Sequence, residues 1–312
     1  MEVIEERFHV GEEADELVMG LECEMPFADS QPTMPYIAAG MPNEAYHAHK
    51  ALSRSALWTF KKLPQKYWYA YLSGKYERPK DTDAMTIGTA VHTLVLEPHL
   101  FDEQYFRFPK VNRTTKAGKA LYAEALEEAA GRILLNAVEY QQCLDMRESI
   151  MANPMIKTMI EEAENPLVEH SMFWTDKETG LHLKCRPDLL SGPLAIDLKT
   201  TLDASFRGFQ SSAFKFGYFM QAAMVRMGCV ALGLPCENFV FIAVEKSAPH
   251  SAGVYVIDPA AWDAAEMQLR TILHDYKKCL DSNVWPGYQI QSLTMPGYAD
   301  YETSNYEIES EE

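Results

Sequence analysis

The sequence lacks the features that mark secreted, membrane-spanning and ATP-driven proteins. Six cysteines are scattered through 312 residues and none has C-x-x-C spacing, which argues against a disulfide framework and indicates reduced thiols in a cytoplasmic protein. No apolar run approaches the roughly 20 residues of a membrane helix, and no basic segment precedes an apolar one near the N-terminus, so we expect no membrane span and no signal peptide. The pattern G-x-x-x-x-G-K-[ST] is missing, which excludes a fused P-loop motor.

Basic residues are nearly absent from both ends of the chain. Residues 1–49 hold eleven acids and one base, and residues 300–312 hold six acids and no base, so these ends account for −16 of the formal net charge of −17. Residues 50–120 instead carry thirteen bases and six acids. A window of this size can be basic by chance. Phosphate binding depends on local charge, however, and the acidic total therefore does not exclude a nucleic-acid partner.

The sequence pattern predicts a single α/β or α+β domain over residues 46–285, between a flexible acidic leader (1–45) and an acidic tail (286–312). Helices dominate the first half, a basic loop is expected over 107–120, and strands dominate the second half. One expected helix begins at Ser53 and runs through the aromatic stretch 67–71 to about Gly74. The other expected helices are 86–96, 118–130, 136–151, 212–231 and 259–281. The expected strands are 167–174, 181–190, 194–199, 238–245 and 252–257.

The second and third expected strands form the most informative feature. Residues 191–193, Ser-Gly-Pro, are a turn signal, and a hairpin of this length folds Asp197 back beside Asp188. Lys199 lies two residues after Asp197, so both side chains point to the same face of a strand. Carboxylates in this arrangement suit a hard divalent cation such as Mg²⁺, and a nearby ammonium suits charge on a phosphate. The alternatives are two surface acids on a turn and a solvated lysine on an edge strand.

This hairpin resembles the motif of the PD-(D/E)xK nuclease superfamily, and three further segments are similar to its RecB-like branch, in particular to RecE-type exonucleases. The resemblance covers about residues 50–285. The matching segments are Pro187-Asp188 with Asp197-Leu198-Lys199, Gly88-Thr89-Ala90-Val91-His92, Tyr218-Phe219-Met220-Gln221 and Leu52-Ser53-x-Ser55-x-Leu57-x-x-Phe60-x-x-x-Pro64. It implies a restriction-endonuclease-like core, with a mixed sheet flanked by helices and an N-terminal helical region.

The resemblance also implies the roles of the site residues. Mg²⁺, with Mn²⁺ as a substitute, would be held by Asp188, Asp197, His92 and the backbone carbonyl of Leu198. Lys199 would assist the attacking water. Gln221 would orient the water or the phosphate. The residues expected to support this site are Glu169 and Tyr218. For His92 and Gln221 the alternative is a satisfied core residue, and for Glu169 it is a solvent-facing acid.

The implied activity is exonucleolytic digestion of linear double-stranded DNA from the 5′ end, without ATP, leaving 3′ single strands for a strand-annealing recombinase. A ring-shaped homo-oligomer is implied as well. No iron–sulfur cluster is expected, because Leu63 stands where such enzymes have a cysteine and Cys279 is the one cysteine in the C-terminal part. Candidates for DNA contact are Arg113, Lys116, Lys119 and Arg186. We expect the aromatic residues at 67–71 to belong to the core rather than to stack on bases.

Three alternatives to this activity stay open at the level of sequence. The first is an endonuclease, or a nuclease for branched or single-stranded DNA, built on the same core. The second is a non-catalytic module that binds DNA or a protein partner, against which the complete Asp-Asp-Lys set speaks. The third, suggested by the acidic ends, is an inhibitor that mimics DNA.

Overall fold

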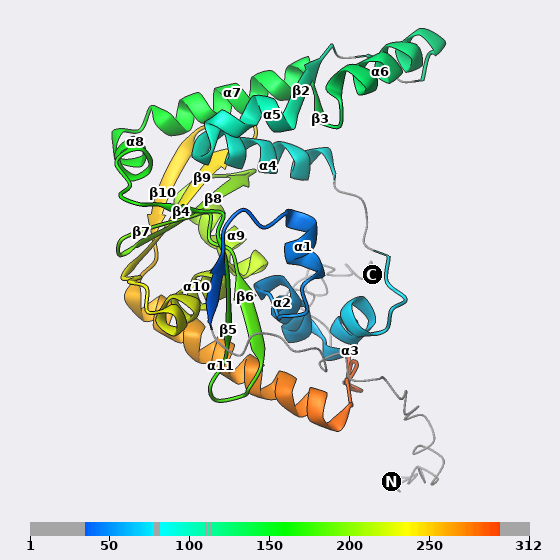
Figure 1. Ribbon diagram of the computed structural model, residues 1–312. Coiled ribbons are helices and arrows are strands. Elements are labelled where there is room, and N and C mark those ends of the chain that lie inside the picture. Colours follow the sequence, from blue (N-terminus) through cyan, green and yellow to red (C-terminus); the bar gives the residue numbers. More distant parts are fainter. Residues whose placement is uncertain (1–34, 78–81, 110, 113, 294–312) are drawn as a thin grey trace, which may run out of the picture.

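A five-stranded mixed sheet forms the centre of the molecule (Figure 1). The computed structural model describes residues 35–77, 82–109, 111–112 and 114–293. Strands β8 and β9 pair in parallel, and all other neighbours in the sheet are antiparallel. The strand order is β10 (Ala252–Val256), β9 (Asn238–Glu245), β8 (Leu194–Thr201), β7 (Leu189–Ser191) and β4 (Leu167–Val168).

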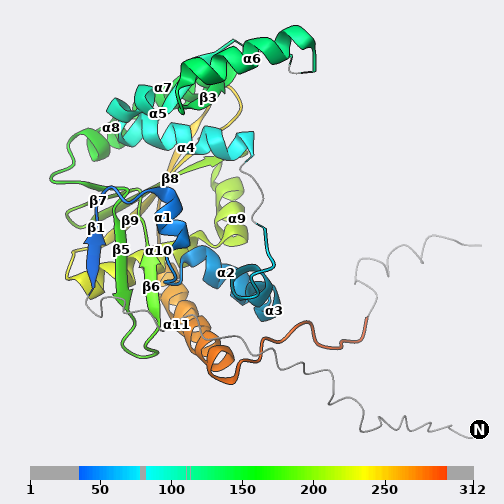
Figure 2. The same ribbon diagram turned by 45° about the vertical axis from the view of Figure 1, so that its right-hand side comes forward.

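Both faces of this sheet are covered by helices, which explains why β9 is apolar from Phe239 to Val244 and why the first half of β8 is apolar up to Asp197. One face packs against α4 (Asp83–Leu96), α7 (Ala137–Met151) and α8 (Pro154–Glu161). The other packs against α2 (Arg54–Lys62), α10 (Tyr218–Leu232) and α11 (Pro259–Ser282). Figures 1 and 2 show the two helical layers on opposite sides of the strands. The predicted restriction-endonuclease-like fold, with helices preceding a mixed sheet, is confirmed.

The predicted helix over 212–231 is in fact two helices, α9 (Phe206–Phe216) and α10. Gly217 separates them with a φ of +73°, a left-handed conformation that ends α9 and that other residues adopt at a cost. The same residue touches the Trp58 ring, because a Cβ placed there would lie 2.7 Å from that side chain. Gly217 therefore fixes where α10 starts and which residues α10 turns toward the sheet.

A second, three-stranded sheet has the order β1 (Tyr36–Ala38), β5 (Ser171–Thr175) and β6 (His182–Cys185). Two predicted strands are each divided between the two sheets: 167–174 becomes β4 and β5, and 181–190 becomes β6 and β7. The breaks have local causes. Glu169 has a φ of +49°, and Pro187, which lacks an N–H, follows β6.

Three other boundaries also differ from the predictions. β1 lies within the range assigned to a flexible leader, and α1 (Asn43–Ala48) begins there; β1 pairs with β5. The expected basic loop over 107–120 contains the end of β2 (Tyr105–Phe108) and the start of α6 (Lys116–Ala129), and β2 pairs in parallel with β3 (Ile133–Asn136).

The helix expected from Ser53 to about Gly74 stops after Lys62. Pro64 then begins α3 (Pro64–Tyr67), and a π-helical turn, η2 (Trp68–Leu72), follows it. Proline suits the first turn of a helix and disrupts an interior, which explains the new start at residue 64.

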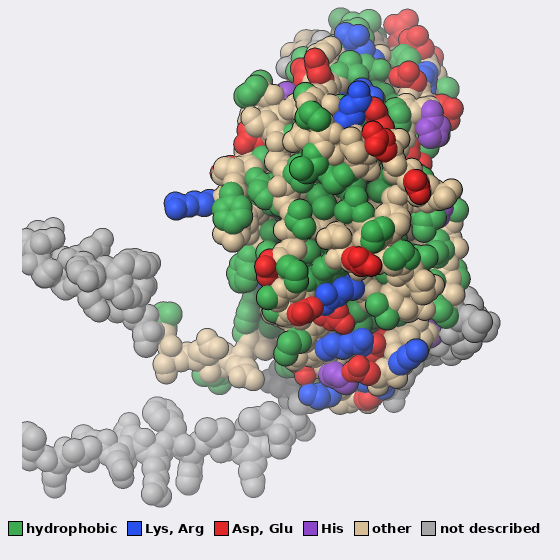
Figure 3. All heavy atoms as spheres, turned by 90° about the vertical axis from the view of Figure 1, so that its left-hand side faces the viewer, with side chains coloured by type: hydrophobic (Ala, Val, Ile, Leu, Met, Phe, Trp, Pro, Cys, Tyr) green, Lys and Arg blue, Asp and Glu red, His purple; other side chains and the backbone are tan. Residues whose placement is uncertain are grey.

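The short helical pieces η3 (Pro98–Leu100) and α5 (Phe101–Gln104) connect α4 to β2. Among the described residues, no helix is both long and apolar enough to cross a lipid bilayer. On the outer face seen in Figure 3, hydrophobic side chains gather in the middle between charged regions above and below.

Candidate active site

Strand pairing places three carboxylates in one row. Leu167 pairs with Leu190 and Val168 with Leu189, so the next position in this register sets Glu169 opposite Asp188. Leu189 pairs with Ile196, and the same register continued by one residue sets Asp188 opposite Asp197. Directly opposed residues project from the same face of a sheet. Glu169, Asp188 and Asp197 therefore converge from three neighbouring strands, and the predicted juxtaposition of Asp188 with Asp197 follows from the observed hairpin.

Hydrogen bonds from two backbone N–H groups hold this row in place. The Glu169 N–H donates to the Asp188 carbonyl at 3.0 Å, and the Leu198 N–H donates to Asp188 Oδ2 at 2.6 Å. Glu169 also has a positive φ, the kind of backbone strain found at functional sites. Asp188 is thus fixed on both sides, and the Leu198 group that contacts it is the N–H. The predicted role of the Leu198 carbonyl stays a prediction.

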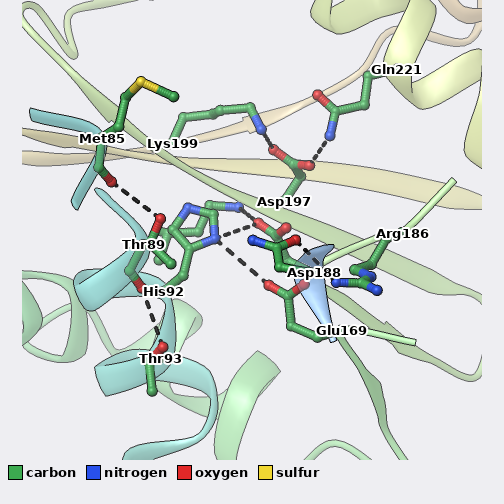
Figure 4. Close-up of polar contacts among 12 residues, drawn as sticks. Met85, Thr89, His92, Thr93, Glu169, Arg186, Asp188, Asp197, Lys199 and Gln221 are labelled. Carbon is green, nitrogen blue, oxygen red and sulfur yellow. Dashed lines mark hydrogen bonds and ion pairs between the residues drawn. The ribbon is translucent and has the colours of Figure 1, made fainter. Parts of the chain in front are cut away.

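His92 completes what we call the ligand cluster: His92, Glu169 and Asp188. From α4 its Nδ1 lies 3.4 Å from Asp188 Oδ2 and 4.0 Å from Glu169 Oε1 (Figure 4). One ligand atom from each of the three residues lies within 4.8 Å of the others. Two carboxylates and one imidazole are a donor set that suits Mg²⁺ or Mn²⁺, so these residues fit the divalent metal site that the sequence predicts.

Asp197, Lys199 and Gln221 form a second group, which we call the lysine cluster. Asp197 is fully buried, and its carboxylate contacts Lys199 Nζ on one oxygen and Gln221 Nε2 on the other (Figure 4). Lys199 Nζ also lies 5.0 Å from the centre of the Tyr218 ring, a cation–π contact. Among the described residues, the amide oxygen of Gln221 is buried without a hydrogen-bond partner, which leaves one acceptor open.

Burial and mutual repulsion shift the protonation of both clusters. Burial, followed by the Asp188 charge, raises the pKa of Glu169 to about 8. The same two causes raise the pKa of Asp197 to about 6, against the lowering effect of Lys199. Burial lowers the pKa of Lys199, but Asp197 and Asp188 more than compensate, so its pKa is raised. A bound cation relieves this repulsion and so stabilises the ionised form of carboxyl groups whose pKa is raised in this way.

The two other acids have different neighbours. Glu169, expected to support the site from outside, belongs to the ligand cluster, whereas Asp197, expected to bind the metal directly, contacts Lys199 and Gln221. The predicted roles of both acids stay predictions. Tyr218 lies against Lys199, as its supporting role requires. Arg54 was missed: Asp197 and Tyr218 are among the charged and polar groups that raise its pKa, against the larger lowering effect of burial. Its only sequence signal was its place in the Leu52-Ser53-x-Ser55 segment.

The candidates for DNA contact lie in different surroundings. Arg186 donates to Ser171 Oγ and to the Met41 carbonyl, both at 2.8 Å, so it ties the start of the chain to β5. Lys116 and Lys119 lie on the first turn of α6, which packs on β2 and β3 and extends beyond α4 at the end of the molecule (Figures 1 and 2). Arg113 is outside the described residues. The four predictions of DNA contact are not tested by these positions and stay predictions.

Comparison with known proteins agrees with the fold. Residues 53–295 match the model of a family described as a PDDEXK-like domain of unknown function (DUF3799). A crystal structure from Eubacterium rectale, described as a candidate exonuclease, has a TM-score of 0.53 at 15% identity and covers 86% of this chain and 100% of that one.

A second crystal structure, of the alkaline exonuclease LHK-Exo from Laribacter hongkongensis, has a TM-score of 0.27 at 16% identity and covers 54% of this chain and 84% of that one. No curated protein matches the chain.

Proposed function

Because the chain belongs to the PDDEXK-like family DUF3799, we propose that it is a metal-dependent nuclease that hydrolyses phosphodiester bonds in DNA. One observation carries the proposal: the ligand cluster and the lysine cluster adjoin, because Asp188 and Asp197 are neighbours across the β7–β8 hairpin. A purely structural ion pair would not require a third carboxylate and an imidazole beside it, since buried like charges cost free energy unless a cation joins them.

Each residue then has a defined task. Glu169, Asp188 and His92 would hold the cation, with Asp197 beside them. When bound, a divalent cation polarises the scissile phosphate and lowers the pKa of a water. Lys199, kept protonated by Asp197, stabilises negative charge that develops on the phosphate. Gln221 donates its amide N–H to Asp197 and offers its open oxygen to an attacking water, which orients that water.

The finer proposal is a RecE-type exonuclease. Such an enzyme digests one strand of linear double-stranded DNA from the 5′ end without ATP and leaves a 3′ strand for a strand-annealing recombinase. The resemblance of the motif segments supports it, as does their arrangement around one site. A homo-oligomeric ring belongs to the same proposal, and the apolar surface on the outer face (Figure 3) supports it, because large exposed apolar patches commonly join protein copies.

The test is cleavage of DNA by the purified full chain with Mg²⁺, with EDTA as the control. Linear duplex should be degraded and closed circular duplex should stay intact. Cleavage of the closed circle would replace the exonuclease by an endonuclease, and absence of any cleavage with Mg²⁺ or Mn²⁺ would overturn the nuclease. Polarity follows from labelling each 5′ end or each 3′ end and reading which label is released first.

A further inference from the structure

A cavity of about 1000 Å³ opens beside the active site and carries a second set of residues that the catalytic proposal does not use. It lies between α1, α2, α3 and η2 on one side and β6 and α10 on the other. Gln221, whose amide donates to Asp197, lines it. The cavity and the lysine cluster therefore share Gln221, so a strand whose phosphate lies at Lys199 would have its next nucleotides there.

The chemistry of the lining is cationic and aromatic. Four of the described lining residues are cationic: Arg54, Lys66, Lys184 and Arg186. None of the described lining residues is an acid, although the chain as a whole is acidic. Arg54 donates to the Phe216 carbonyl at 3.0 Å, and Asp197 and Tyr71 are among the groups that oppose the lowering of its pKa by burial. Positive charge along a groove with aromatic rings is the pattern of proteins that bind unpaired nucleic-acid strands.

The aromatic wall comes from η2 and the residues after it. Tyr69, Tyr71 and Tyr76 line the cavity and are 48%, 49% and 46% exposed, which is unusual for residues within an aromatic cluster. The Tyr69 and Tyr76 rings meet edge to face at 6.1 Å. Tyr71 stacks at 4.9 Å on Tyr67, which is buried. The expectation that residues 67–71 belong to the core therefore applies to Tyr67 and not to Tyr69 and Tyr71.

The backbone presents these rings on a rigid support. Tyr67 is fixed by a hydrogen bond between its hydroxyl and that of Tyr276 at 2.9 Å and by stacking on Trp285 at 5.5 Å. The π-helical turn of η2 follows at once, closed by the Ser73 N–H donating to the Trp68 carbonyl at 2.9 Å. Single π-helical turns occur frequently at functional sites, because the wider turn redirects side chains. Here it turns Tyr69 and Tyr71 into the cavity.

We propose that this cavity binds unpaired bases of the DNA strand being cut, by stacking them on Tyr69, Tyr71 and Tyr76. The proposal rests on the nuclease function for its substrate and goes beyond it by assigning the tyrosine wall. Cations at Arg54 and Lys66 pair with phosphates, and the rings accept bases of any sequence. A fully paired duplex has no free base faces to offer, so the cavity favours single strands and frayed ends.

The test measures binding in EDTA, where a metal-dependent nuclease does not cut. The full chain is titrated with a short single-stranded oligonucleotide that carries 2-aminopurine, whose fluorescence is quenched on stacking, and with the same oligonucleotide made abasic. We expect quenching, and an affinity for the abasic strand that is weaker by about tenfold or more. Equal affinities without quenching would overturn the proposal, and this comparison does not depend on any variant.

Two variants locate the effect. Tyr69→Ala/Tyr71→Ala/Tyr76→Ala should lose the quenching and bind both oligonucleotides at the abasic level. Tyr69→Phe/Tyr71→Phe/Tyr76→Phe should behave as the wild type, because it keeps the rings. An alanine variant that still prefers the ordinary strand by tenfold would overturn the assignment to these rings.

The outcome is separable from that of the proposed function. If the wild type degrades linear duplex with Mg²⁺ but does not discriminate against abasic DNA, the nuclease proposal holds and the stacking proposal is overturned. If the wild type discriminates and quenches but does not cut, the nuclease proposal is overturned and the stacking proposal holds.

Discussion

The ligand cluster and the lysine cluster are neighbours but are built differently. The lysine cluster takes two of its three side chains from one strand, β8, and its carboxylate is completely buried and compensated by Lys199. The ligand cluster collects one residue from each of three segments separated by some 20 to 80 positions in the chain. Its two carboxylates have His92 as their shared neighbour, and His92 is charged only when protonated.

Because of this difference, we expect the lysine cluster to contribute mainly to folding stability and the ligand cluster mainly to metal binding. The lysine cluster is balanced without a metal, so removing one member leaves an unpaired buried charge. The ligand cluster carries excess negative charge until a cation binds, so removing one of its carboxylates relieves repulsion in the metal-free protein. The four predictions below test this contrast, from the largest expected effect to the smallest.

Asp188→Asn should reduce Mg²⁺-dependent cleavage about a thousandfold or more while leaving the fold intact. The loss corresponds to about 4 kcal/mol of transition-state stabilisation, of the size that a metal site supplies. Cleavage rates on linear duplex measure it, and Glu124→Gln, which removes an exposed acid on α6, is the matched control. A reduction similar to that of the control would place the chemistry elsewhere.

Lys199→Ala should destabilise the protein by about 3 kcal/mol at pH 8, because Asp197 is left buried without its cationic partner. Urea unfolding measures this. The double variant Asp197→Asn/Lys199→Met, which removes both charges, should recover most of the stability and stay inactive. If Lys199→Ala unfolds at the same urea concentration as the wild type, the pair does not stabilise the buried carboxylate.

The metal-free protein should lose stability as the pH rises from about 4 to about 8. In the unfolded chain, carboxyl groups ionise near pH 4, whereas in the folded chain the pKa values of Asp197 and Glu169 are raised to about 6 and about 8. A raised folded pKa contributes stability that is complete below the unfolded pKa and is lost as the pH passes the folded one.

Urea unfolding in EDTA at pH 5 and pH 8 measures this slope, and Glu169→Gln should flatten it. Mg²⁺ should stabilise the protein more at pH 8 than at pH 5, because binding requires ionised ligands. A free energy of unfolding that increases with pH in EDTA would contradict the description of the ligand cluster.

His92→Ala should give the smallest effect and should change metal preference. Imidazole suits Mn²⁺ better than Mg²⁺, which prefers oxygen ligands. We expect the affinity for Mn²⁺ to fall about tenfold, equivalent to about 1.4 kcal/mol, and the affinity for Mg²⁺ to fall less. Activity titrations with each metal distinguish the two, and equal losses would mean that His92 positions Asp188 rather than binding the metal.

Most of the lysine cluster could be predicted from local sequence signals, whereas the ligand cluster could be predicted only in part. The Ser-Gly-Pro turn at 191–193 and the i, i+2 spacing of Asp197 and Lys199 are local signals, so they predict the hairpin and its shared face. His92 and Gln221 had no local signal and were identified through the resemblance. The structure brings these four residues together around Asp188, and their roles stay proposals.

Glu169 shows why the rest could not be predicted. Its place depends on β4 pairing with β7 across twenty positions, while β5 and β6 between them are diverted to another sheet. The diversion depends on a left-handed residue that is not glycine, for which a single sequence gives no warning. The split at Gly217 is the opposite case, because a glycine between apolar stretches was visible and was interpreted as part of one helix.

Calorimetric titration of Mg²⁺ is the most direct test of the division into two clusters. The wild type should bind the ion, Glu169→Gln and Asp188→Asn should bind it at least about tenfold more weakly, and Lys199→Ala should bind it while failing to cut DNA. If the wild type does not bind Mg²⁺, or if Glu169→Gln binds it as tightly as the wild type, the ligand cluster is not the metal site.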